Sequence, residues 1–197
     1  MGRPIAGCLG LGILLCALGG PGLAEEPRVT QEWSRQGRAV AAGFMAELRT
    51  ELLAALEAGG PVNGIEVCRG KAREIAERHS RESGFRVGRT SSRSRVRNPR
   101  NTPDAWEAKV FATFQARAAA GEPPGGLEHS EVVDQGGRRV FRQLLAIPMG
   151  EPCLACHGEK LDAKVQGAIH ALYPEDRAVG FRVGEVRGAF TLSRDLE

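Results

Sequence analysis

The most specific chemistry in this chain lies in the run EPCLACHGEK, residues 151–160. Two residues separate Cys153 from Cys156, and His157 follows directly. In such a run the two thiols can add to the two vinyl groups of a porphyrin, which brings the histidine under the iron as an axial ligand. The spacing therefore predicts one haem c, covalently attached through Cys153 and Cys156, with His157 bound to the iron.

Two other uses of paired cysteines fit this run less well. A zinc ribbon needs a second Cys-x-x-Cys pair, which the sequence does not contain. A thioredoxin-type redox pair is the remaining alternative, but it needs a strand-to-helix setting inside a βαβ pattern. Here a histidine follows the second cysteine and the flanking sequence shows no such pattern, so haem attachment is favoured.

The first 24 residues have the features of an export signal. An arginine near the start precedes the uncharged run 5–20, and small residues lead to Ala24 just before the first acids. The apolar run is shorter than the roughly 20 residues of a membrane span, so cleavage after Ala24 is favoured and an uncleaved anchor is the alternative. We expect a signal peptide at 1–24, a periplasmic location and a single domain at 25–197.

Export of the chain gives Cys68 a particular meaning. Removal of the signal would leave three cysteines, namely Cys68 and the two of the Cys-x-x-Cys-His run, called the haem run below. An odd number of cysteines does not suit a disulfide framework.

Aromatic residues are only 5% of the chain. We therefore expect a core built mostly of Val, Ile, Leu and Ala, with a bulky apolar cofactor filling the remainder.

Helical periodicity dominates the first half of the chain. Apolar residues at intervals of three and four predict a long helix over residues 28–59, ended by a Gly-Gly-Pro run. A second helix over residues 63–80 would place Cys68 at the centre of its apolar stripe. A third is predicted over residues 101–121, with Thr102 as its cap.

Strand patterns dominate the second half. A short strand is predicted at residues 84–90, a hairpin at 127–133 and 138–148, and one long or two short strands at 180–196. A helix at residues 163–174 follows the haem run. Helices followed by an antiparallel sheet indicate an α+β domain, with the haem run just beyond the end of a strand.

Four stretches between about residues 65 and 190 occur in an order that resembles a known family: IEVCRGKAREIA, RVGRTSSRSRVRNPRNTPDAWE, CLACHG and YPEDRAVGFRVGEVRGAF. The family consists of exported c-type haem domains with a PAS-like fold, found as single-domain cytochromes and as sensory domains of histidine kinases and chemoreceptors. The resemblance implies a PAS-like antiparallel sheet. It also implies that Cys68, the cysteine of the first stretch, is the axial ligand opposite His157.

The residues by themselves leave that second ligand open. Six side chains have the chemistry to bind haem iron there: Cys68, Met45, Met149, His79, His129 and His170. His170 is the second candidate, because it lies in an apolar helix downstream of the haem run; its alternative role is a partly buried histidine satisfied by a carbonyl. For Cys68 the alternative is an inert buried thiol.

The other four candidates fit less well. Met149 is too close in sequence to Cys153 to reach the opposite porphyrin face, and Met45 is expected to fill the core. His79 lies too far along the same helix from Cys68 to share one iron, so we expect a solvated histidine at a helix end. His129 falls in a polar strand and is expected at the surface.

Six arginines lie in a stretch without acidic residues: Arg86, Arg89, Arg93, Arg95, Arg97 and Arg100. Export excludes nucleic acid as the partner of this basic run. A guanidinium pairs bidentately with a carboxylate, so Arg89 and Arg97 are predicted to hold the haem propionates. We expect most of the six to be solvated, or to dock an acidic partner.

A thiolate opposite His157 would stabilise ferric iron and lower the reduction potential. Loss of Cys68 on reduction would open a site for carbon monoxide or nitric oxide, which suits a sensor. The sequence thus predicts a periplasmic redox or gas sensor component without enzymatic activity, acting on an unidentified redox or signalling protein. A periplasmic electron-transfer cytochrome is the alternative, and a peroxidase, which needs a distal acid or base, is third.

Overall fold

The computed structural model describes residue 2 and residues 22–196. The predicted signal peptide therefore lies outside the described residues, apart from Gly2 and the three residues 22–24. Within the described part, no helix is both long and apolar enough to cross a membrane.

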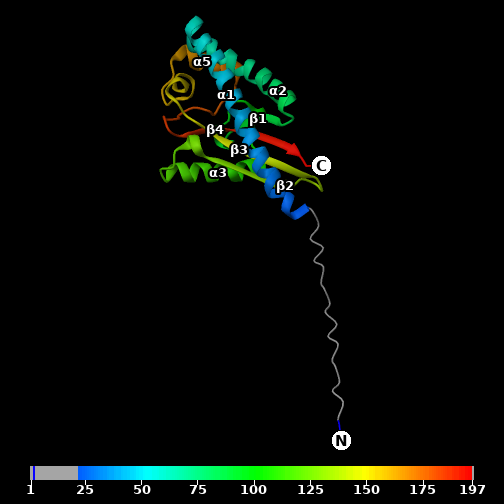
Figure 1. Ribbon diagram of the computed structural model, residues 1–197. Coiled ribbons are helices and arrows are strands. Elements are labelled where there is room, and N and C mark those ends of the chain that lie inside the picture. The colour runs from blue at the N-terminus through cyan, green and yellow to red at the C-terminus, as the bar shows by residue number, and fades with distance from the viewer. Residues whose placement is uncertain (1, 3–21, 197) are drawn as a thin grey trace.

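A four-stranded antiparallel sheet forms the centre of the molecule (Figure 1), with strand order β1-β4-β3-β2. The strands are β1 (Arg86–Thr90), β2 (Glu128–Asp134), β3 (Arg139–Pro148) and β4 (Val186–Asp195). β2 and β3 form the predicted hairpin, whose turn has Gly136 and Gly137 in the left-handed region that glycine tolerates best. The predicted α+β class with an antiparallel sheet is confirmed.

Helices cover both faces of the sheet (Figure 1). They are α1 (Gly22–Arg69), α2 (Lys71–Ser83), α3 (Ala105–Ala119), α4 (Leu154–His157) and α5 (Ala163–Leu172). α1 and α2 pack on one face and α3 on the other, which gives three layers. Single 3-10 turns lie in the connections, at Arg93–Arg95, Pro99–Asn101, Pro124–Gly126 and Glu151–Cys153.

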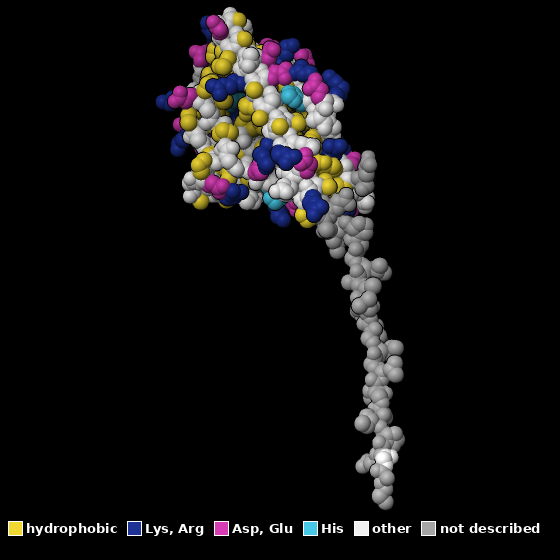
Figure 2. Space-filling model, in the orientation of Figure 1, with side chains coloured by type: hydrophobic (Ala, Val, Ile, Leu, Met, Phe, Trp, Pro, Cys, Tyr) yellow, Lys and Arg dark blue, Asp and Glu magenta, His cyan; other side chains and the backbone are white. Residues whose placement is uncertain are grey.

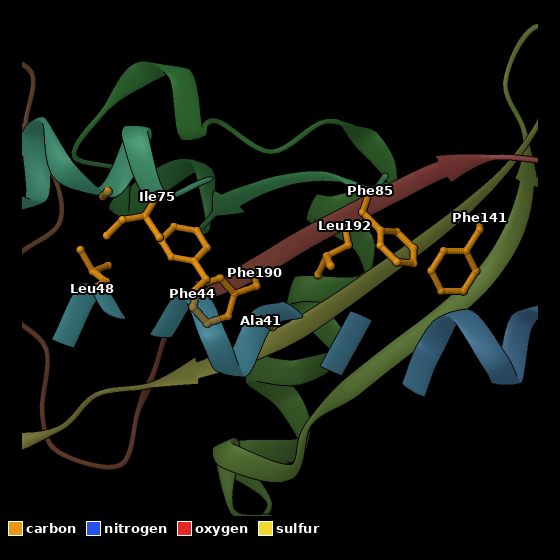
Figure 3. Close-up of a cluster of buried hydrophobic side chains, with 9 residues drawn as sticks. Ala41, Phe44, Leu48, Ile75, Phe85, Phe141, Phe190 and Leu192 are labelled. Atoms are coloured by element: carbon orange, nitrogen blue, oxygen red, sulfur yellow. The ribbon is translucent and has the colours of Figure 1, made fainter. Parts of the chain in front are cut away.

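Valine, isoleucine, leucine and alanine supply most of the buried apolar residues that the structure describes, as expected, and phenylalanine supplies most of the rest. All seven phenylalanines of the chain are buried. In the cluster between α1, α2 and the sheet, Phe44 packs against Phe190 with ring centroids 5.1 Å apart, and Phe85 and Phe141 continue the row (Figure 3). The few aromatic residues are thus concentrated where burial of each ring contributes most to stability.

The helical stretch from Gly22 to Ser83 is interrupted twice. Gly59 and Gly60 have non-helical backbone angles, which confirms the predicted break there. The second predicted helix is wrong in its continuity, because Gly70 separates α1 from α2. Ile65 before the break packs on α5, whereas Ile75 after it packs on α1 and the sheet, so one straight helix does not serve both contacts.

Two other predicted boundaries are also corrected. Asp104, not Thr102, caps α3: its carboxylate accepts from the N–H of Glu107 at 2.8 Å, and its own N–H donates to the Glu107 carboxylate at 3.1 Å. This reciprocal capping box satisfies two helix-end groups at once, and the Thr102 hydroxyl instead donates to Pro99. The last strand begins only at Val186, because residues 182–185 form a turn.

Candidate functional site

A cavity of about 1140 Å³ opens between the end of α1, α2, β1, the loop after β1 and the end of α5. Its wall includes Cys68 and the side chains of Phe44, Arg89, Arg97 and Tyr173. A volume of this size accommodates a large organic ligand. Cys68 is half-buried in the last turn of α1, two residues before the break at Gly70, rather than at the centre of the apolar stripe of one helix that runs to residue 80.

The Cys-x-x-Cys-His run lies between two small apolar clusters. Cys156 packs beside Ile65 and Tyr173, and Cys153 packs beside Met149 and its neighbours. Burial raises the pKa of the Cys156 thiol; the charge of Arg97 opposes this shift, and the charges of Cys68 and Cys153 add to it. The charge of Cys68 thus acts on Cys156, and the role of Cys68 as the second axial ligand stays a prediction.

His157 is held in one orientation at the end of α4. Its side chain is buried, its Nδ1 lies 2.6 Å from the carbonyl of Ala178, and its Nε2 lies 3.1 Å from Nη2 of Arg187. Since a carbonyl only accepts, Nδ1 carries the hydrogen and Nε2 presents its lone pair. A backbone carbonyl that fixes the tautomer in this way is typical of histidines that bind metal.

The charge state of His157 suits the same role. Burial lowers its pKa well below the ordinary value, and the positive charges of Arg187 and Arg97 lower it further. The imidazole is consequently neutral, which is the form that binds a metal ion.

The segment that holds His157 is itself anchored by Arg97. Arg97 pairs bidentately with Asp176 at 3.0 and 3.1 Å, and Nη2 also donates to the carbonyl of Cys156 at 2.6 Å. Asp176 in turn accepts from the N–H of Ala178 at 2.9 Å. Arg97 lines the cavity, but its guanidinium is already engaged by these partners, and its binding of a haem propionate stays a prediction.

Arg89 is placed differently. It lines the cavity, lies 5.8 Å from the ring of Phe44 and forms no ion pair with any residue that the structure describes. Burial lowers its pKa, while the charge of Cys68 acts in the opposite direction. Arg89 is thus a half-buried cation at the cavity wall.

The remaining ligand candidates lie elsewhere. Met149 is buried beneath the haem run, Met45 packs on the first core cluster, and His129 is exposed as predicted. His170 is exposed on α5 rather than partly buried. Of the six candidate ligands, Cys68 alone lines the cavity that the structure describes.

His79 is not the solvated histidine expected from the sequence. Its ring stacks on Phe44 with centroids 6.1 Å apart, and Nε2 lies 3.4 Å from the Glu47 carboxylate on α1. The packing of α2 along α1 encloses this ring, and a helical pattern in one segment does not reveal such packing.

Half of the arginine run is engaged in ion pairs, although one of these pairs, that of Arg86, is itself exposed. Arg86 pairs with Asp195, Arg95 with Glu185 and Arg97 with Asp176, at N–O distances of 2.9–3.0 Å. Arg93 and Arg100 are exposed, as expected for most of the run. On the face shown in Figure 2, basic side chains are interspersed with acidic ones rather than gathered in one patch. Acidic residues distant in sequence thus neutralise part of the run.

Sequence reasoning missed Arg187, the residue that contacts His157. It is the extra residue of a β-bulge in β4, because Gly188 pairs with Ile147 while Val186 pairs with the next residue, Pro148. A bulge redirects the side chain it carries. The available signal was Gly188, where a Cβ would lie 2.8 Å from the carbonyl oxygen of Thr90 and clash with it.

Comparison with known proteins identifies the family. A sequence model of the Tll0287-like family matches residues 26–194. The chain belongs to this family. Its fold is similar to that in a crystal structure of the cyanobacterial heme-protein Tll0287, with a TM-score of 0.59 and 22% sequence identity over 83% of this chain and 96% of that one. No functionally curated protein matches the chain.

Proposed function

We propose that the protein binds one haem c, attached covalently through Cys153 and Cys156, with His157 and Cys68 as the axial ligands of the iron. It then acts in the periplasm as a redox or gas sensor component, without enzymatic activity. The observation that carries this proposal is the geometry of His157, a neutral buried imidazole whose Nδ1 is tied to a backbone carbonyl and whose Nε2 lone pair is directed at a cation.

The residues of the site fit a haem in three respects. The donor set, two thiols followed by an imidazole with a third thiol nearby, is what covalent attachment and two-sided ligation require. The cavity lined by Cys68 shares Arg97 and Tyr173 with the surroundings of Cys156. Cationic side chains around the site match the carboxylates of a haem.

Each residue has a distinct task in this proposal. Bound haem supplies one-electron redox chemistry and a site for diatomic gases. Arg97 fixes the segment that orients His157, through Asp176 and Ala178. Cys68 donates electron density, which favours the oxidised state and lowers the reduction potential.

A sensor is favoured over an electron carrier because of where Cys68 lies. Its thiol is half-buried in the last helical turn before Gly70, so it can withdraw without displacing the buried residues of α1 further back in the helix. A ligand that leaves when the redox state changes suits sensing, whereas electron transfer favours a ligand set that does not change. The heme-protein of similar fold is consistent with either role.

The test is electron paramagnetic resonance of the ferric full-length protein, produced in a host that attaches c-type haem. We expect a low-spin, thiolate-type signal that disappears in Cys68→Ala and persists in His170→Ala, the matched control. A signal that survives in Cys68→Ala contradicts the ligand assignment. Carbon monoxide binding to the reduced protein would support the sensor, while rapid electron exchange without ligand binding would support the carrier.

A further inference from the structure

Arg187 is brought to the site by backbone geometry and not by a regular strand pattern. It is the unpaired residue of the bulge in β4, and its own carbonyl accepts from the hydroxyl of Ser91 at 3.1 Å. Its guanidinium lies 3.1 Å from Nε2 of His157 and 6.0 Å from the ring of Phe181. A bulge of this kind is a built feature that aims one side chain.

The charge of Arg187 has no anionic partner among the residues that the structure describes. Its polar side-chain contact is the neutral His157, unlike Arg97 and Arg95, which pair with Asp176 and Glu185. Burial, followed by the charges of Arg89 and Arg97, lowers the pKa of Arg187 to about 10, so it remains protonated at neutral pH. A guanidinium in this setting is stabilised by any carboxylate that comes within reach.

The contact between Arg187 and His157 conflicts with iron binding. Nε2 has one lone pair, and an N–H of Arg187 and an iron ion compete for it. If His157 binds iron, as the proposed function requires, Arg187 loses its acceptor and needs another. A haem carries two propionate carboxylates, and a guanidinium binds a carboxylate bidentately.

We propose that Arg187 is a haem-carboxylate-binding residue, which exchanges Nε2 of His157 for a propionate when the haem is bound. This inference rests on the proposed function. It adds to the site a residue outside the arginine run, and it leaves Arg97 as a positioning residue whose guanidinium is committed to Asp176.

The test compares haem-loaded, full-length variants: Arg187→Gln, Arg187→Lys and the control Arg194→Gln. Arg194 lies on the same strand but packs over Trp33, 4.7 Å from its ring centroid. We expect the propionate bands of the resonance Raman spectrum to shift in both Arg187 variants and to stay in place in the control. The ferric-to-ferrous equilibrium should move toward ferric in Arg187→Gln, by about tenfold or ~59 mV, and much less in Arg187→Lys, which keeps the charge.

The paramagnetic resonance signal of the same samples separates the two levels of the proposal. A thiolate-type signal together with propionate bands that do not move in either Arg187 variant would overturn the role of Arg187 alone. Wild-type protein without covalent haem, or without that signal, would overturn the proposed function and this inference with it. Arg187→Lys is the milder substitution, so a failure of Arg187→Gln to fold does not remove the test.

Discussion

We predict that removal of the ion pair between Arg97 and Asp176 destabilises the segment around the Cys-x-x-Cys-His run more than removal of any other single contact there. Both side chains are less than a tenth exposed, at 9% and 8%. Asp176→Ala would leave the buried Arg97 charge without an anionic partner, and it would also leave the N–H of Ala178 without its acceptor. Breaking a buried pair by removing one partner costs about 3–5 kcal/mol.

That cost is large compared with the total stability of a domain, which is on the order of 5–15 kcal/mol. For a chain of this size it corresponds to a fall in melting temperature of roughly 6–20 °C. We would measure the free energy of unfolding by urea denaturation followed by circular dichroism, at equal haem content for all variants.

The matched control is Asp195→Ala, which removes the exposed ion pair with Arg86, whose side chains are 43% and 59% exposed. Exposed pairs contribute about 0–1 kcal/mol, so this variant should unfold almost like the wild type. The double variant Arg97→Met with Asp176→Leu should recover much of the loss, because it removes the stranded charge. If Asp176→Ala cost no more than Asp195→Ala, the argument that this pair supports the site would be refuted.

Other predictions concern the scaffold. Gly37→Ala should destabilise the fold by about 1–3 kcal/mol, because the new Cβ would lie 2.0 Å from Oε1 of the buried Gln143. Gly167→Ala on α5, where nothing lies within 4 Å of the new Cβ, should instead stabilise the fold by roughly 0.5–1 kcal/mol. Equal melting temperatures for these two variants would contradict the packing at Gly37. Asp104→Ala should remove the α3 cap at a cost of about 1 kcal/mol, measured by thermal denaturation. Burial tends to raise the pKa of Asp104, but the N–H of Glu107 and the charge of Arg142 outweigh it, so the pKa lies below the ordinary 3.8. The cap's contribution should therefore be complete above pH 3.8 and disappear as the pH falls through the lowered value, a dependence that Asp104→Ala should lack.

The sequence by itself determined the features that depend on neighbours along the chain. The two-residue spacing of Cys153 and Cys156 next to His157 indicated covalent haem. The periodicity of the hydrophobic residues and the turn-forming residues predicted the helices, the hairpin and the break at Gly59 and Gly60. The Thr102 cap was wrong because two nearby positions both had capping side chains. Only the reciprocal bond to Glu107, seen in three dimensions, selects Asp104.

Only the tertiary structure decided which residues meet at the site. Arg97 forms its ion pair with Asp176, 79 positions away in the sequence. Arg187 contacts His157 because it lies at a β-bulge, which results from the register shift between β3 and β4. His79 is enclosed by α1 rather than by its own helix. A buried charge or lone pair is satisfied by the polar group that packing places within about 3 Å of it. The periodicity of the sequence does not encode such contacts between residues far apart in the chain.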